Sequence, residues 1–210
     1  MLPKFYQTHL QKQLNTNQYI LLNLLVELLQ SQKQVRLERL AANLPLPILF
    51  ESRRRQLQRF LISPKLSISS VWFGIISYLL DNYFFDSKKL LIVVDRTQWR
   101  ELNLLMVSLV WNSRAIPLNW QFLSHKGNSS FTQQQALFTS VLPLLKGYQV
   151  TALGDREFCS IELGQWLDKQ GLSICLRLRR SGVYSLSNRV YTAVKATRIK
   201  TRYVYVFCWS

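Results

Sequence analysis

The segment Leu90-Leu-Ile-Val-Val-Asp95 decides the fold, because it is an uninterrupted apolar run that ends in a carboxylate. A run of this kind, rich in β-branched residues, predicts a short strand buried on both faces, since a half-exposed strand would alternate apolar and polar side chains. A second segment, Tyr148-Gln-Val-Thr-Ala-Leu-Gly-Asp155, has the same layout. The sequence therefore predicts two strands that each place an aspartate at the rim of one sheet.

The residues between and after these strands predict a mixed sheet. Two apolar runs, residues 102–111 and 115–123, flank the polar turn Asn112-Ser-Arg114, which is the pattern of a β-hairpin. Periodicity and end signals predict the remaining elements in this order: a helix at 132–145, a strand at 148–153, a helix at 161–169 and a strand at 172–180. Consecutive strands followed by alternating helices and strands predict an α/β (α+β) fold in which helices flank a mixed sheet.

The N-terminal part of the chain is predicted to be a helical region. Apolar residues at helical spacing predict helices over 17–32, 35–42 and 48–61, with a break imposed by prolines between the last two. The helix at 48–61 carries four arginines: Arg53, Arg54, Arg55 and Arg59. Three short helices that end in an Arg-rich one resemble a helix-turn-helix, whose last helix contacts DNA. The alternative is a small helical bundle with solvated arginines.

The chain is strongly basic, with a formal net charge of +16 and a pI near 10.2. A charge of this size implies an anionic partner, and nucleic acid is the commonest such partner for a protein without a lipid signal. A further helix predicted at 68–85 leads into the sheet. We therefore expect a helical DNA-binding region at 1–67, an α/β core at 68–182 and a basic tail at 183–210 that could add one more strand.

Other classes of site and location are disfavoured. His9 and His125 are isolated, and the cysteines lack the spacing of zinc ligands, so no zinc site is expected. The three cysteines are expected to be reduced thiols of a cytosolic protein: Cys159, Cys175 and Cys208. The N-terminus lacks the layout of a signal peptide, and charged or polar residues interrupt each apolar stretch before it reaches membrane-spanning length. We therefore expect a cytoplasmic protein without a membrane partner.

The two strand-end aspartates suggest a metal site. Asp95 and Asp155 are hard oxygen donors without nearby Cys or His ligands, which suits Mg²⁺ or Mn²⁺. Such ions can activate an attacking hydroxyl and stabilise the leaving oxygen of a phosphodiester. The alternative is that each aspartate is simply a turn residue at the end of a strand.

Three motifs carry a family resemblance: Val93-Val-Asp-Arg-Thr-Gln-Trp99, Lys126-Gly-Asn-Ser129 and Leu153-Gly-Asp-Arg-Glu-Phe158. Together they resemble the catalytic core of bacterial insertion-sequence DDE transposases over residues 68 to about 182. The third motif is specific to that family, whereas the first alone would not be. The resemblance implies an RNase H-like fold for the core and a DNA-binding role for the helical N-terminus.

The resemblance also implies an activity, which is metal-dependent strand cleavage at transposon ends and strand transfer to target DNA. Asp95 matches the first metal-binding acid and Asp155 the second, and a complete family member holds two Mg²⁺ or Mn²⁺ ions. DNA contacts or packing are expected of the surrounding motif residues: Trp99, Lys126, Arg156 and Glu157. Glu157 is expected either to support Asp155 or to form a plain salt bridge. Further DNA contacts are expected at Arg179 and Arg180. The implied setting is the bacterial nucleoid, with a homodimer or pairing with intact transposase.

The third acid of the family does not appear in this chain. It would be a glutamate in a Tyr, Arg, Glu, Lys block after the last core strand, and residues 181–210 contain neither Asp nor Glu. The other nearby acids lack motif support: Glu101, Glu162 and Asp168. We therefore expect a truncated transposase with little or no strand transfer by itself. The alternatives are a DNA-binding remnant that represses transposition, and an RNase H-like nuclease unrelated to transposition.

Overall fold

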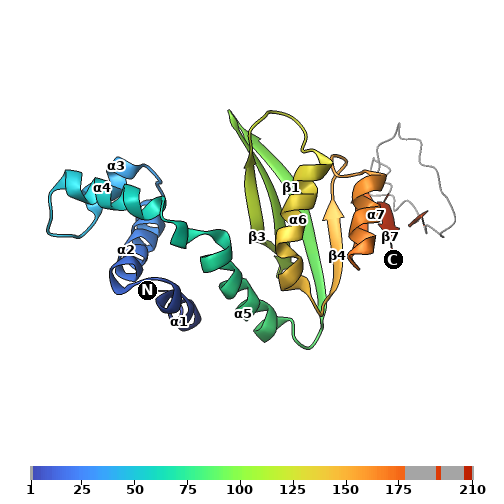
Figure 1. Ribbon diagram of the computed structural model, residues 1–210, viewed down its shortest axis with the longest axis horizontal. Coiled ribbons are helices and arrows are strands. Elements are labelled where there is room, and N and C mark those ends of the chain that lie inside the picture. Colours follow the sequence, from blue (N-terminus) through green and yellow to red (C-terminus); the bar gives the residue numbers. More distant parts are fainter. Residues whose placement is uncertain (1, 178–192, 195–205, 210) are drawn as a thin grey trace. The chain divides into compact units, whose positions relative to one another are not determined.

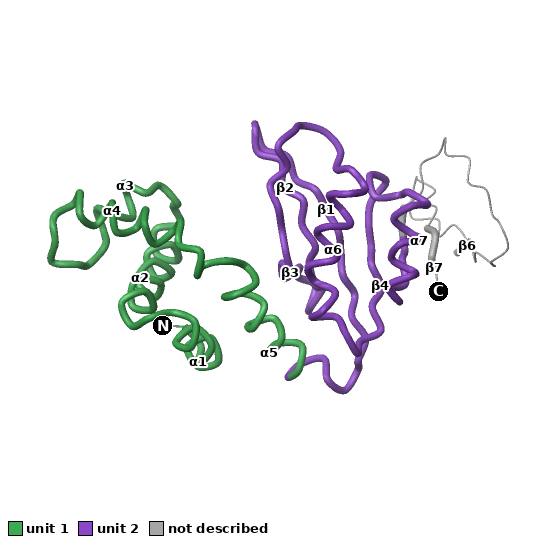
Figure 2. Tube along the Cα trace, in the orientation of Figure 1, with its two compact units in different colours: residues 1–81 green, residues 82–210 purple. Residues whose placement is uncertain are grey.

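The computed structural model describes residues 2–177, 193–194 and 206–209. The chain divides into two compact units, residues 1–81 and 82–210 (Figure 2). This division falls later than the boundary after residue 67 that the sequence suggested. None of the helices in the described part of the chain is both long and apolar enough to cross a membrane.

The first unit is helical, as predicted. Its elements are α1 (Lys4–Gln13), α2 (Thr16–Gln32), α3 (Leu37–Asn43), α4 (Phe50–Leu61), a 3-10 turn (Pro64–Leu66), a π-helical turn (Ile68–Trp72) and the start of α5 (Phe73–Tyr83). Helix α1 was not predicted, because it is mostly polar and buries only Leu10. The helix predicted at 68–85 exists, but it opens with the π-helical turn and ends at Tyr83.

Helices α2, α3 and α4 share one hydrophobic core. The buried members are Leu21, Leu25, Leu40, Ala41, Leu44, Leu57 and Phe60. Helix α2 begins at a capping box. The Asn15 side chain accepts a hydrogen bond from the Gln18 backbone N–H, and the Gln18 side chain accepts one from the Asn15 backbone N–H. The link between α3 and α4, residues 44–49, contains the two prolines that end the first of these helices.

The second unit is a mixed sheet with helices on one face (Figure 1). Its strands are β1 (Lys89–Trp99), β2 (Leu102–Trp111), β3 (Arg114–Leu123), β4 (Gln149–Gly154), β5 (Ser173–Arg177), β6 (Ala193–Val194) and β7 (Val206–Trp209), in the order β3-β2-β1-β4-β5-β7-β6. Strands β1 to β3 form an antiparallel meander, and β4 and β5 continue the sheet parallel to β1. Helices α6 (Phe131–Leu145) and α7 (Ile161–Lys169) pack on it. This confirms the predicted α/β class, in which helices flank a mixed sheet.

The hairpin between β2 and β3 also forms as predicted. Asn112 and Ser113 both have positive φ, at 48° and 61°, which is the requirement of a tight turn whose twist matches the strands. The paired strands span residues 102–111 and 114–123.

Strand β1 differs from its prediction in length and in burial. It runs on to Trp99, and only one of its faces is fully buried: Leu90, Ile92 and Val94 are covered, whereas Leu91 is 38% exposed. The reason is that α6 packs on the face of the sheet that carries Val94. Asn119 of β3 lies in register with Val94 across β2, and its side chain donates a hydrogen bond to the Ser140 hydroxyl of α6. The prediction of a strand buried on both faces was therefore wrong.

Candidate functional site

The two aspartates lie at neighbouring positions on adjacent parallel strands. The pairing of β1 with β4 ends with Val93 opposite Leu153 and Val94 opposite Gly154, so Asp95 and Asp155 occupy the next position on each chain. Adjacent strands lie about 4.8 Å apart. Both aspartates are exposed. The register thus brings the two predicted site residues together at the carboxyl ends of their strands.

The turn after β4 is shaped by Asp155 itself. Its Oδ1 atom accepts a hydrogen bond of 2.8 Å from the backbone N–H of Glu157, which closes an Asx turn and ends the strand. Phe158 follows and is 1% exposed, so it anchors this turn in the core of the unit. The Gly-Asp-Arg-Glu-Phe motif therefore has a local structural role in ending β4.

A largely buried ion pair ties the two strand ends together. The Nε atom of Arg96 lies 2.8 Å and 2.6 Å from the two carboxylate oxygens of Glu157. The two side chains are only 16% and 10% exposed. Arg96 directly follows Asp95, and Glu157 lies two residues after Asp155. The ion pair therefore holds the backbone that carries one aspartate against the backbone that carries the other.

Neighbouring polar groups complete this arrangement. Ser129 donates to Glu157 Oε1 from its backbone N–H and from its hydroxyl, each at 2.9 Å. Arg96 Nη1 donates to Asn103 Oδ1 at 3.1 Å, and the Asn103 amide donates to the carbonyls of His125 and Gly127. We call Arg96, Asn103, Ser129 and Glu157 the strand-end clamp. It connects β1, β2, the loop before α6 and the turn after β4.

Only part of the strand-end clamp was predicted from the sequence. Glu157 forms a salt bridge, one of its two expected roles, and its partner is Arg96. Arg96 and Ser129 stand inside the quoted motifs, and their complementary chemistry could have suggested contact with Glu157. Asn103 had no local signal, because its partners lie in a distant loop.

The donor set at the strand ends fits a hard divalent cation. Mg²⁺ retains several water ligands and is commonly held by one or two carboxylates together with substrate phosphates. The Asx turn uses one oxygen of Asp155, and both aspartates are solvent-exposed, so carboxylate oxygens remain available. Within the described residues, no group of three or more His, Cys, Asp or Glu side chains is placed to hold a metal ion.

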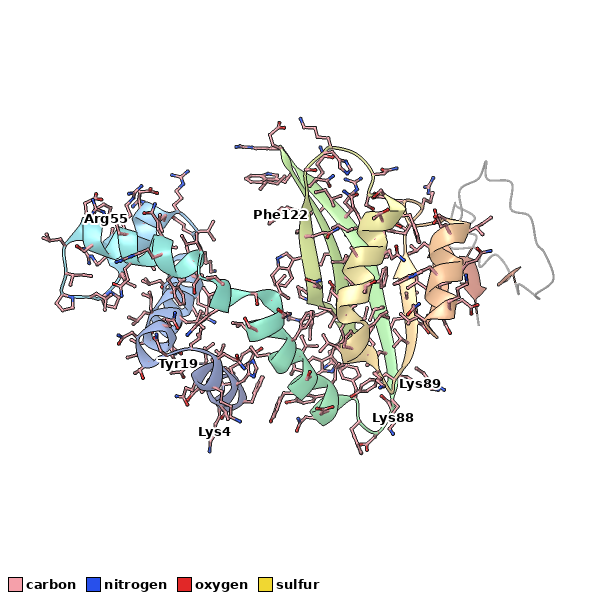
Figure 3. All side chains as sticks on the ribbon, in the orientation of Figure 1. Lys4, Tyr19, Arg55, Lys88, Lys89 and Phe122 are labelled. Carbon is pink, nitrogen blue, oxygen red and sulfur yellow. The ribbon has the colours of Figure 1, made fainter. Side chains whose placement is uncertain are left out.

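The four arginines of α4 lie in two different environments. Arg53 is half-buried and donates to the Leu44 carbonyl at 2.9 Å, and Arg54 lies near Glu38 and Glu51, at 3.7 Å and 4.0 Å. Arg55 (labelled in Figure 3) and Arg59 are exposed and line one open hollow with Ser52, Gln58, Leu61 and Ile62. Their spacing of one helical turn puts them on the same face of α4.

The other expected DNA contacts are distributed as follows. Lys126 is exposed and forms an ion pair with Glu101 at 3.0 Å. Arg156 is exposed in the turn after Asp155. Arg179 and Arg180 lie outside the described residues. Within the described residues, Cys159 and Cys175 form no disulfide bond, and Cys208 lies in β7.

Comparison with known proteins gives a distant structural similarity. No family model matches the chain, and no curated protein sequence matches it either. Among solved structures, the chain is similar to a piggyBac transposase in a synaptic complex with hairpin DNA, with 12% identity and a TM-score of 0.42. The match covers 97% of this chain and 50% of the transposase. The chain therefore spans about half the length of that protein.

Proposed function

We propose that this protein acts on DNA in transposition, with a helix-turn-helix unit that binds DNA and an RNase H-like core built for phosphoryl transfer. Asp95 and Asp155 hold a divalent cation, Mg²⁺ or Mn²⁺, at the carboxyl ends of β1 and β4. One observation supports the proposal: the parallel register gives Asp95 and Asp155 neighbouring positions at the ends of β1 and β4, and the strand-end clamp links the backbone next to each of them.

The chain's own residues have separate tasks in this proposal. The bound cation would supply Lewis-acid stabilisation of charge on phosphate oxygens. Asp95 and Asp155 position it, and the clamp keeps their spacing constant while DNA binds. A largely buried pair such as Arg96 and Glu157 is costly to desolvate, which is consistent with a role in fixing geometry.

We expect this chain alone to transfer strands weakly. The resembled family uses a third acid after the last core strand, and residues 181–210 offer none. Two carboxylates can still hold one cation with water and phosphate ligands. Cation binding is therefore the sharper test than strand transfer.

The test is a Mn²⁺ titration followed by electron paramagnetic resonance. We expect the full chain to bind Mn²⁺ at one site, and Asp95→Asn or Asp155→Asn to weaken binding at least tenfold, because each removes one charged ligand. Asp86→Asn is the matched control, since Asp86 is an exposed aspartate in the turn before β1. Equal Mn²⁺ affinity in the wild type and in all three Asn variants would contradict the proposal.

A second function is favoured by the helical unit, which presents Arg55 and Arg59 outward. In this case the protein occupies transposon ends and represses an intact transposase. Strand transfer by an intact transposase would then fall as this chain is added, and Arg55→Gln with Arg59→Gln would relieve the repression. If an equimolar amount of this chain leaves strand transfer by an intact transposase unchanged, the repressor function is excluded.

A further inference from the structure

The face of the sheet that carries Asp95 continues into an aromatic surface. Strand β1 runs past Asp95 to Trp99, beyond the end of β4. In the register of β1 to β3, Asp95 pairs with Met106, Thr97 with Leu104, and Trp99 with Leu102. Residues that pair across antiparallel strands share a face. Asp95 and Trp99 therefore lie on one surface, separated along the strand by about 13 Å.

Large apolar side chains from three strands gather on this surface. Trp99 is 63% exposed, Leu102 is 49% exposed, and Phe122, which pairs with Leu104, is 64% exposed. The set, which we call the Trp99 patch, consists of Trp99, Leu102, Leu104, Met106, Trp120 and Phe122. Figure 3 places Phe122 and Lys89 at opposite ends of the sheet, so the patch lies at the end of β1 where Asp95 is found.

We propose that the Trp99 patch binds unpaired nucleobases by stacking, next to the carboxylates of Asp95 and Asp155. The inference rests on the proposed function and names its substrate more closely, as DNA with a frayed or single-stranded end. Aromatic side chains bind unpaired bases independently of sequence, because every base has a π-face. The separation of about 13 Å corresponds to about four nucleotides of a DNA strand.

The charges around the patch favour a nucleic acid over an apolar partner. The Arg100 guanidinium lies 5.0 Å from the centre of the Trp99 ring, in a cation–π arrangement. Glu101, the acidic residue of the same turn, is paired with Lys126. A cation beside an exposed aromatic ring can contact a phosphate while the ring stacks on a base. A purely apolar partner would leave Arg100 desolvated without an anion.

The chain offers a matched control for this surface. Phe85 is also 63% exposed, and the Lys88 ammonium lies 5.7 Å from its ring. It precedes β1, at the end of the sheet opposite Asp95. Phe85→Ala therefore removes an exposed aromatic ring with an adjacent cation without changing the surface that continues from Asp95.

The test measures DNA binding by the full chain in buffer with chelator, so that it is independent of cation binding. The probes are a fluorescent blunt duplex and the same duplex with a short unpaired extension. We expect the extension to tighten binding about tenfold, and Trp99→Ala or Phe122→Ala to remove most of that gain, because one stacked base contributes on that order. Trp99→Phe and Phe85→Ala should retain it. Circular dichroism confirms that each variant is folded.

A second measurement needs no variant. Iodouracil placed in the unpaired extension should crosslink to Trp99 or Phe122, as mapped by mass spectrometry. The inference is overturned if the wild type shows no preference for the extension, if both alanine variants keep the preference, or if crosslinks map elsewhere. It is also overturned if the patch variants change only self-association in sedimentation. None of these outcomes affects Mn²⁺ binding, which tests the proposed function separately.

Discussion

At the scale of single residues, Glu157 is the most informative position in the core. Its carboxylate accepts from Arg96 and from both donors of Ser129, and its backbone N–H bonds Asp155. Glu157→Gln removes the charge but keeps an acceptor. We expect the free energy of unfolding to fall by about 2 kcal/mol, because Arg96 loses its partner in a largely buried setting. Urea unfolding measures this, and Mn²⁺ affinity should fall in parallel.

The exposed ion pair of Glu101 with Lys126 is the control for that prediction. Its side chains are 81% and 62% exposed, so Glu101→Gln should change the free energy of unfolding by less than about 1 kcal/mol. If Glu157→Gln and Glu101→Gln have equal effects on stability and on Mn²⁺ affinity, the clamp does not position the aspartates.

A second residue-scale prediction concerns Gly74 of α5 in the helical unit. A Cβ atom at this position would lie 1.9 Å from Cε1 of His9, so Gly74→Ala forces the imidazole to move. We expect a loss of about 1–3 kcal/mol in the free energy of unfolding, typical of an overpacked site. His9→Ala should restore much of this loss in the double variant, because it frees the space. If the losses of stability caused by Gly74→Ala and His9→Ala simply add in the double variant, the close approach of His9 to Gly74 is contradicted.

At the scale of elements, the proposed DNA-binding face of the first unit lies on α4. Replacing Arg55 and Arg59 by Gln should weaken DNA binding uniformly across sequences and reduce the slope of log affinity against log salt by about 2, since each phosphate contact contributes about 0.9. Lys4→Gln is the control, because Lys4 is an exposed cation of α1 in the same unit. A slope unchanged by the arginine substitutions would show that this face does not contact phosphates.

Elements with a local cause could be predicted from the sequence. The β2–β3 hairpin follows from two turn residues of positive φ between apolar runs, and α4 follows from its amphipathic spacing. Helix α1 could not be predicted, because its sequence is polar and only packing within its unit stabilises it. The prediction that β1 is buried on both faces was wrong, because a local sequence pattern does not show which face of a sheet the helices cover.

At the scale of the whole molecule, the strand-end positions of Asp95 and Asp155 were predictable from the sequence. The strand-end clamp that links the two strand ends was not. A strand-end aspartate can be found from an apolar run, and the pairing of two parallel strands follows from the order of elements. The clamp joins residues 61 positions apart, and it depends on a register that no local pattern specifies. The arginines of α4 illustrate the same limit, because the contact of Arg53 with the Leu44 carbonyl and that of Arg54 with Glu38 are tertiary.

The positive charge is shared between both units of the chain. Of the 27 Lys and Arg residues, 10 fall in residues 1–81 and 17 in 82–210, whereas the 11 acids divide as 4 and 7. Each unit is therefore basic, and we expect both to contact DNA. Binding should weaken steeply with salt beyond the effect of α4 alone, which titration of DNA affinity against potassium chloride measures. Salt dependence that disappears in the Arg55 and Arg59 double variant would show that only the helical unit contacts DNA.

The most direct test of the central claim is a crystal of the full chain soaked in Mn²⁺ and measured for anomalous scattering. We expect an anomalous peak coordinated by the carboxylates of both Asp95 and Asp155, at the ends of β1 and β4. The peak should be absent from crystals of Asp155→Asn. A peak at other residues, or no peak between these two carboxylates at millimolar Mn²⁺, would contradict the claim that the strand ends form a metal site.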